Sequence, residues 1–462
     1  MSARVTVITE AIASPPPGVV VDSGQAFIVG QCQRGPSHDP VRVFGLADYE
    51  ATFGGRTGAT DMYDVVASAF KEGLGSAYIC RAVGPTPVYA TVSLDTGKIV
   101  ATAKEYGSYF NTNFTVAYTS LTKSITVVKP SPLTTVTYTG TDATSLQTAA
   151  SVDADLTITV SSLPSGDVAA APLATGTDDY GNAVVATSLG YLDADLGDGA
   201  VVWPGKVSSA TSAALEAHCA STNRLGLVTV AAGTTAANAI VAAAAVTSGE
   251  NLALVWPHVK ATTSAGTLTI EPTGLALGAR ARAHAAEGPW ASPVRDVYGK
   301  AKWVTDLYAA SDTTAAQWLT LNEGNVSVVR TSNGSLRLYG WRAIDAPDGV
   351  TNLQAAQHRD TINRVAVGCQ RIAEEFVGRT VDGKGLVLGE FAGQLTGFLA
   401  SMSGGFYAGS DDPGYVVDVG PGVNTTANLA AGDVAAAVGV RLAPSAEFIT
   451  IRISATDAAG AI

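Results

Sequence analysis

VVW (Val201–Trp203), LGLVTV (Leu225–Val230) and LALVW (Leu252–Trp256) are short apolar runs that alternate with the Ala-rich runs SATSAALEAHCA (Ser209–Ala220) and AANAIVAAAAV (Ala236–Val246). The apolar runs have the length of strands, and the Ala-rich runs have the length and composition of helices. Short apolar strands separated by helices are typical of a mostly parallel sheet that helices cover. This stretch therefore predicts an α/β domain.

The chain before this stretch begins with a similar pattern. An apolar strand is expected at Ala26–Val29. A helix should follow, with Thr60 as its N-cap and Gly73 just past its end, because Thr caps helix starts well and Gly suits the residue after a helix. Ala77–Val83 is expected as the next strand. These elements give residues 21–87 a compact α/β start.

Residues 88–185 have a different composition. Thr and Val alternate in Ser124–Val128 and in Leu156–Val160, as in half-buried strands. Asp95–Gly97 has the composition of a hairpin turn. No helical periodicity is visible here, and Pro164–Tyr180 is expected as an irregular exit. The pattern predicts an inserted β-rich domain.

The last third of the chain predicts two long helices. Apolar residues recur at spacings of three and four from Ile362 to Phe376, which makes one helix stripe. Asp360 and Arg364 lie four residues apart on this helix and are expected to form an exposed ion pair. A second helix is expected over Leu386–Met402. This part of the chain therefore has an α+β character.

Both ends of the chain alternate like strands. Pro15–Gly18 is expected to be a rigid extended linker that would hold the first strand away from its own domain. We therefore expect two extended strand arms, residues 1–20 and 447–462. Their apolar residues are Val5, Val7 and Ile8 in the first arm, and Phe448, Ile449, Ile451 and Ile453 in the second.

Composition limits the partners of the chain. Its 462 residues are enough for two to four domains. The net charge of −12 makes nucleic acid and anionic membranes poor partners. The sequence has neither a run of about 20 apolar residues nor a signal-like start, so folding in the cytoplasm is expected. Charged residues supply only 15%, against about 25% in typical soluble domains, which suits a surface largely covered by other copies of the chain.

Motifs with strict spacing rules for catalysis are absent: there is no GxxxxGK[ST], no HExxH and no GxSxG. The best metal candidate is DADLGDG, whose Asp193, Asp195 and Asp198 resemble the start of a calcium loop. However, Gly197 occupies the third ligand position and Pro204 stands where the bidentate Glu belongs. An acidic turn between domains is the better explanation, and we expect no metal and no other cofactor.

Six segments follow one another in the order of a known family and span nearly the whole chain. They are GQCQRGPSHDP (Gly30–Pro40) with FGLADYEATF (Phe44–Phe53), GLGSAYICRAV (Gly73–Val83), EYGSYFNTNFTV (Glu105–Val116), EPTGLALGARARAHAAEGPWASP (Glu271–Pro293), LNEGNVSVVRTSNGSLRLYGWR (Leu321–Arg342) and GDVAAAVGVRLAPSAEFITIRI (Gly432–Ile453). Together they resemble the contractile-tail sheath proteins of myophages, R-type bacteriocins and related injection systems. One departure is TVDGK (Thr380–Lys384), which stands where the family has Phe-Glu-Pro-Asn before its last long helix.

The resemblance implies an α+β multidomain fold. An α/β core would be formed by the N- and C-terminal parts, with an inserted β-rich domain, a middle α/β domain and extended terminal strand arms. The expected boundaries are 1–20 for the first arm, 21–87 for the first part of the core, 88–185 for the insertion, 186–345 for the middle domain, 346–446 for the second part of the core and 447–462 for the last arm.

The resemblance also implies a structural protein rather than an enzyme. Such a subunit polymerises helically around an inner tail tube and contracts to drive the tube through a target envelope. Its partners would be other copies of itself, the tube protein, and the baseplate and tail terminator proteins, without direct nucleic-acid contact or membrane insertion. It would assemble in the host cytoplasm and act in the virion tail. A phage tail, a bacteriocin and an injection system all remain open.

A second function class is a hydrolase whose site is hidden from sequence spacing. The two classes differ in size, because sheath subunits form rods or rings of megadalton mass and an enzyme forms a small oligomer.

Two surfaces are predicted to serve assembly. The terminal strands are expected to be exchanged between neighbouring subunits, because a strand at a chain end can add to a neighbour's sheet edge. The second surface contains Gly389, Gly393 and Gly397, spaced by four on the expected helix Leu386–Met402. Each Gly costs about 1 kcal/mol relative to Ala inside a helix. Either the helix packs closely on its own domain, or it lays a smooth face against the inner tube.

Overall fold

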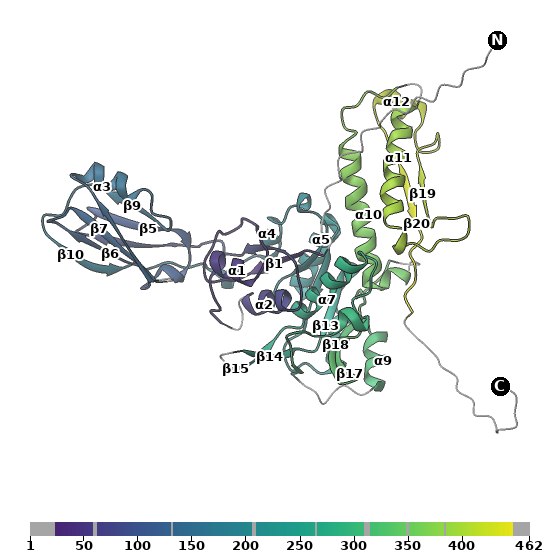
Figure 1. The fold of residues 1–462 in the computed structure, drawn as a ribbon, viewed down its shortest axis with the longest axis horizontal. Helices are drawn as coiled ribbons and strands as arrows, with labels where there is room; N and C mark the ends of the chain where they lie inside the picture. Colours follow the sequence, from purple (N-terminus) through teal and green to yellow (C-terminus); the bar gives the residue numbers. More distant parts are fainter. Residues whose placement is uncertain are drawn as a thin grey trace, which may run out of the picture.

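A computed structural model describes residues 24–58, 62–130, 133–205, 209–263, 266–308, 315–347, 351–382 and 385–446. In Figure 1 these residues form a β-rich body on one side, an α/β body in the middle and a module of long helices on the other side. The two expected strand arms, with Val5, Val7, Ile8, Phe448, Ile449, Ile451 and Ile453, lie outside the described residues.

An eight-stranded sheet organises the middle body, in the order β18-β17-β13-β12-β11-β1-β3-β2. The six strands from β17 to β3 run parallel, and the short edge strands β18 and β2 run antiparallel to their neighbours. The strands are β1 (Ala26–Gly30), β2 (Val41–Val43), β3 (Ala77–Arg81), β11 (Ala200–Val202), β12 (Leu225–Val228), β13 (Leu252–Trp256), β17 (Val326–Ser332) and β18 (Ser335–Leu338). All residues of β1, β11, β12 and β13 are buried, as expected for parallel strands covered on both faces.

Helices cover both faces of this sheet. Along one face lie α1 (Leu46–Phe53), α2 (Tyr63–Lys71) and α7 (Thr273–Ala286). Along the other lie α4 (Val185–Leu189), α5 (Ser209–Thr222), α6 (Ala236–Ala244) and α9 (Ala315–Glu323). Close packing of α2 on α7 depends on Gly278, because a Cβ there would collide with Glu72. The short helix α8 (Asp296–Gly299) and a small sheet of β14 (Val259–Thr263), β15 (Gly266–Ile270) and β16 (Asp306–Leu307) complete the body.

The sheet corrects the expected division of the core. We expected the N-terminal part to share its core with the C-terminal part, beside a separate middle α/β domain. Instead β1 pairs with β3 on one side and with β11 on the other, so the N-terminal and middle parts form one sheet. The physical reason is that β1 is apolar throughout, and an interior parallel strand needs a neighbour on each edge as well as helices on both faces.

The β-rich body lies within residues 88–185 and has its own core. Two antiparallel sheets, β10-β6-β7-β8 and β4-β5-β9, enclose it. The strands are β4 (Tyr89–Leu94), β5 (Ile99–Tyr106), β6 (Thr115–Thr119), β7 (Ser124–Pro130), β8 (Leu133–Thr139), β9 (Leu156–Val160) and β10 (Val168–Pro172).

Two expectations for this body were wrong. Helix α3 (Ala143–Ala150) was not foreseen, although Asp142 and Ser145 form a capping box at its start. The segment Pro164–Tyr180, expected to be irregular, contains β10, which pairs with β6. Both elements are rich in Ala, which gives little hydrophobic contrast along the chain and hides the periodicity.

The C-terminal module contains two long helices and a hairpin. The helices are α10 (Ala356–Glu374) and α11 (Leu386–Ser401), close to their expected ranges, and the hairpin is β19 (Tyr415–Asp418) with β20 (Ala437–Val440). Gly368 allows the helices to approach, because a Cβ there would collide with the ring of Phe398. The short helix α12 (Thr426–Ala431) lies between the hairpin strands in sequence. In the described part of the chain, no helix has the length and apolar character needed to cross a membrane.

Candidate functional site

The first turns of α10 form the junction between the α/β body and the C-terminal module. Five successive polar residues, Gln357, His358, Arg359, Asp360 and Thr361, are all buried there. Burial of polar groups is unfavourable unless they have partners. The contacts of this helix start therefore decide how the two bodies are held together.

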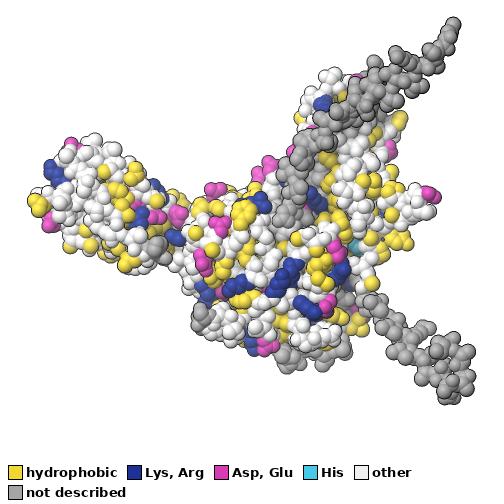
Figure 2. Space-filling view, viewed as in Figure 1, with side chains coloured by type: hydrophobic (Ala, Val, Ile, Leu, Met, Phe, Trp, Pro, Cys, Tyr) yellow, Lys and Arg dark blue, Asp and Glu magenta, His cyan; other side chains and the backbone are white. Residues whose placement is uncertain are grey.

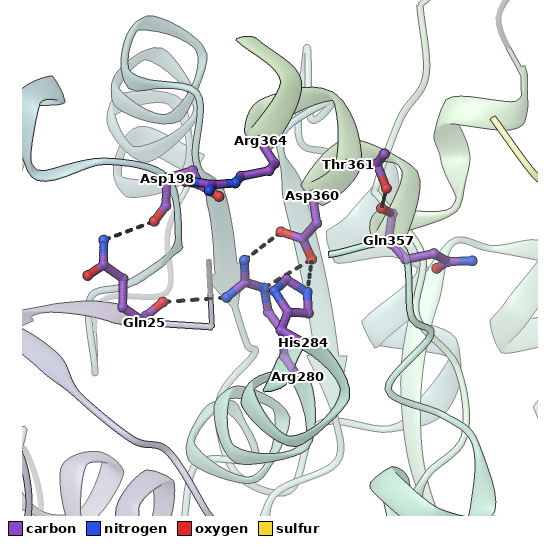
Figure 3. A network of polar contacts seen from close by, with 8 residues as sticks. All are labelled: Gln25, Asp198, Arg280, His284, Gln357, Asp360, Thr361 and Arg364. Carbon is purple, nitrogen blue, oxygen red and sulfur yellow. Dashed lines mark hydrogen bonds and ion pairs between the residues drawn. The ribbon is translucent and has the colours of Figure 1, made fainter. Parts of the chain in front are cut away.

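A buried ion pair lies at the centre of the junction (Figure 3). Arg280 of α7 donates to Asp360 of α10 through Nε and Nη2, at 3.0 and 2.8 Å from its two carboxylate oxygens. The side chains are 2% and 1% exposed. His284 lies one turn after Arg280 on α7, with its Nε2 3.4 Å from Oδ2 of the same carboxylate. Such a bidentate pair is both strong and geometrically specific.

The charges in this cluster are set by burial and by Arg280. Burial lowers the pKa of His284, and Arg280 lowers it further, although Asp360 acts in the opposite direction. Burial would raise the pKa of Asp360, but Arg280 and the hydrogen bond with His284 outweigh it and keep that pKa below its ordinary value. At neutral pH the Asp360 carboxylate is therefore negative and the His284 imidazole neutral.

A second pair extends the network toward the central sheet. Arg364 of α10 lies 3.2 Å from Asp198, whose side chain is only 2% exposed. Gln25, directly before β1, donates through Nε2 to the backbone carbonyl of Asp198 at 3.0 Å. The backbone carbonyl of Gln25 accepts from Nη1 of Arg280 at 3.4 Å. Segments far apart in sequence thus meet at one junction.

This network corrects the expected exposed pair of Asp360 with Arg364. Each of the two residues is instead paired with a residue of another element, Asp360 with Arg280 and Arg364 with Asp198. The i,i+4 spacing is compatible with a solvent-facing pair, but it carries no information on what packs against the helix.

The acidic turn DADLGDG is also placed by the structure. Asp193 accepts a hydrogen bond from the backbone N–H of Asp195, and Asp198 pairs with Arg364. Within the described ranges, no group of three His, Cys, Asp or Glu residues is arranged to hold a metal ion. The contacts of these carboxylates are a local turn hydrogen bond at Asp193 and an ion pair at Asp198.

The three glycines of α11 pack against none of the described residues. Gly389, Gly393 and Gly397 are exposed, and a Cβ at any of them would meet nothing within 4 Å. Among the described residues, nothing therefore supports the alternative that this stripe packs closely on its own domain. The buried side of α11 carries Phe391, Leu395 and Leu399 instead. In Figure 2 the visible surface of the C-terminal module is mainly hydrophobic or uncharged.

The hairpin β19–β20 offers open strand edges. Its sheet contains two strands, and no further strand of the described chain pairs with either of them. Val416 in β19 is 60% exposed. An unpaired edge carries free backbone N–H and C=O groups and can accept another strand.

Comparisons with solved structures identify the fold. The contracted helical sheath of the anti-feeding prophage aligns with a TM-score of 0.60 and 15% identity, covering 98% of this chain and 99% of that one. The sheath tail protein of Desulfitobacterium hafniense aligns with a TM-score of 0.60 and 15% identity, covering 90% and 93%. A chain in the baseplate of the anti-feeding prophage aligns with a TM-score of 0.56 and 14% identity, covering 99% and 100%.

No family model matches the sequence, and no curated protein matches it. The chain nevertheless has the fold of contractile sheath proteins over nearly its whole length.

Proposed function

We propose that this chain is the sheath subunit of a contractile tail or injection device. It polymerises helically around an inner tube and contracts to drive the tube through a target envelope. The observation that carries the proposal is the likeness to a contracted sheath over 98% of the chain. A structural rather than catalytic role goes with this fold, and the protein acts in the assembled particle.

Other copies of the chain are its first partners in this proposal. The likeness to a chain in a baseplate supports contact with baseplate proteins. The inner tube and tail terminator proteins complete the set of partners, because the six sequence segments resemble those of tail sheaths. The junction around Arg280 and Asp360 would keep the two bodies of each subunit together while subunits move relative to one another.

The terminal arms would link neighbouring subunits through the β19–β20 hairpin. Its edges are unpaired in the described chain, and residues 1–20 and 447–462 have the alternation of half-buried strands. A strand added from a neighbour gains backbone hydrogen bonds along the whole edge. Because these contacts are repeated head to tail and do not close, they generate an open helix.

The purified protein is expected to form rods or stacked rings of megadalton mass without added ligand. Light scattering during size-exclusion chromatography measures this mass directly. A chain that remains a small oligomer at high concentration, with both termini intact, would contradict the sheath proposal and favour the alternative of an enzyme.

The glycine face of α11 is proposed to lie against the inner tube. Gly393→Leu should fold normally, because none of the described residues lies within 4 Å of its Cβ position and Gly is about 1 kcal/mol less favourable than Ala inside a helix. We expect this variant to form empty sheath but no tails with tube, as counted by negative-stain microscopy. Gly368→Leu is the matched contrast and should misfold, because Phe398 occupies the space. Normal tails from Gly393→Leu would rule out the tube face.

A further inference from the structure

The first turn of α10 forms hydrogen bonds with residues 443 and 445, near the end of the described chain. His358 lies with Nε2 2.9 Å from the backbone carbonyl of Ala443. Because a carbonyl only accepts hydrogen bonds, this nitrogen carries the proton. The neighbouring Gln357 donates through Nε2 to Oγ of Ser445 at 3.1 Å. Both α10 side chains are buried, with 5% and 3% of their surface exposed.

The same short strip is also held from its other side. Leu442 forms an isolated bridge with Phe406, and the N–H of Ala443 donates to the carbonyl of Gly405 at 2.9 Å. Residues 442–445 are therefore held between the short turn at 403–405 and the first turn of α10. This fixes both the position and the direction of the chain just before the last described residue, Ala446.

The first turn of α10, which holds residues 442–445, is itself bound to the α/β body. Asp360, one turn after Gln357, is held by Arg280. Arg359 forms a further ion pair with Glu250 at 3.2 Å. A force applied to residues 442–446 would pass through α10 into the α/β body, and not only into the hairpin that precedes them.

Gln357 has a feature that stability alone does not explain. Its Oε1 is buried and has no hydrogen-bond partner in the described structure. A buried acceptor left unpaired is unfavourable, so an apolar side chain of similar size would serve packing at least as well. The hydrogen bond to Ser445 is the contact that requires an amide at this position.

We propose that Gln357 and His358 are positioning residues for the C-terminal arm. They hold residues 442–445, directly before the arm, at the junction. The arm would then start from the same position and in the same direction in every subunit. This inference rests on the proposed sheath function for its purpose. The hydrogen bonds between α10 and residues 443 and 445 form within the isolated chain, so their effect can be measured without assembly.

The test is limited trypsin digestion of the full-length chain, with the new C-terminus at Arg441 followed by mass spectrometry. Local opening controls such cleavage, and one lost hydrogen bond raises the opening equilibrium roughly fivefold. Gln357→Leu should therefore speed cleavage after Arg441 about fivefold while leaving the melting temperature unchanged. Combining it with His358→Leu should speed cleavage further.

Two matched variants make the result decisive. Gln370→Leu makes the same change at an exposed position of the same helix and should leave cleavage after Arg441 unchanged. Ser445→Ala removes the hydroxyl that accepts the hydrogen bond from Gln357. Because Ser445 is exposed, this change leaves the core intact. It should speed cleavage after Arg441 as much as Gln357→Leu does. If Gln357→Leu and Ser445→Ala are cleaved at the rate of Gln370→Leu, the positioning role is wrong. A wild-type chain that forms no rods would overturn the sheath function but not this measurement.

Discussion

Deletion of residues 1–12 is expected to leave a folded, soluble subunit that cannot polymerise. The deletion removes the strand-like residues Val5, Val7 and Ile8 before the Pro15–Gly18 linker and leaves the described fold intact. An arm that gains about five backbone hydrogen bonds, at roughly 1 kcal/mol each, also buries two or three aliphatic side chains at about 1.5–3 kcal/mol apiece. Ordering about six residues costs about 1–2 kcal/mol for each of them. The net association free energy at each junction between subunits is then only a few kcal/mol. Loss of one arm should therefore prevent helical assembly.

The melting temperature and negative-stain microscopy together check this deletion. Ile451→Pro is the companion variant for the other arm, because proline removes a backbone donor from a strand. Both variants should keep the melting temperature of the wild-type subunit and form no rods. Normal sheath from the truncated chain, or outright unfolding, would contradict the exchanged-arm account.

Asp360→Asn is expected to lower the free energy of unfolding of the junction by about 3–5 kcal/mol, because it leaves the buried Arg280 guanidinium without its counter-charge. Thermal and urea denaturation of the isolated subunit measure the loss. The double variant Arg280→Met with Asp360→Leu should recover part of it, since apolar side chains of similar size can replace a buried pair.

Asp296→Asn is the matched control for this variant. Asp296 also pairs with basic residues, Lys300 and Arg337, but its side chain is 56% exposed. Exposed pairs contribute about 0–1 kcal/mol, so the control should melt close to wild type. Equal losses from the two substitutions would show that the junction pair does not hold the bodies together.

The regular elements could be predicted from the sequence because their signals are local. The alternation of apolar and Ala-rich runs in residues 201–256 predicts β11, α5, β12, α6 and β13, and the structure confirms them within a few residues. The spacing of Ile362 to Phe376 predicts α10 in the same way. In each case the periodicity of side chains along one element is sufficient.

The arrangement of elements could not be predicted, because it depends on contacts between distant segments. The apolar sequence of Ala26–Gly30 indicates an interior strand, but it does not indicate which strands lie beside it. Its pairing with Ala200–Val202 was therefore missed. The buried pair of Arg280 and Asp360 was missed for the same reason, since 80 residues separate its members. The only local signal was the presence of Arg280 and His284, four residues apart, in a helix otherwise rich in Ala, Gly and Leu.

The glycines of α11 show a different limit. Sequence spacing identifies Gly389, Gly393 and Gly397 as one stripe but cannot tell whether the stripe is covered within the subunit. None of the described residues covers this stripe, and such a long-range absence of packing is not visible in sequence spacing.

A helical reconstruction of rods formed by the wild-type protein tests the central claim most directly. It would show whether the edges of β19–β20 carry added strands, and from which subunit they come. The account predicts that residues near Arg4–Glu10 and Phe448–Ser454 of neighbouring copies extend this hairpin into a larger sheet. Rods in which both hairpin edges remain bare, or in which each chain's own arms fill them, would contradict the account.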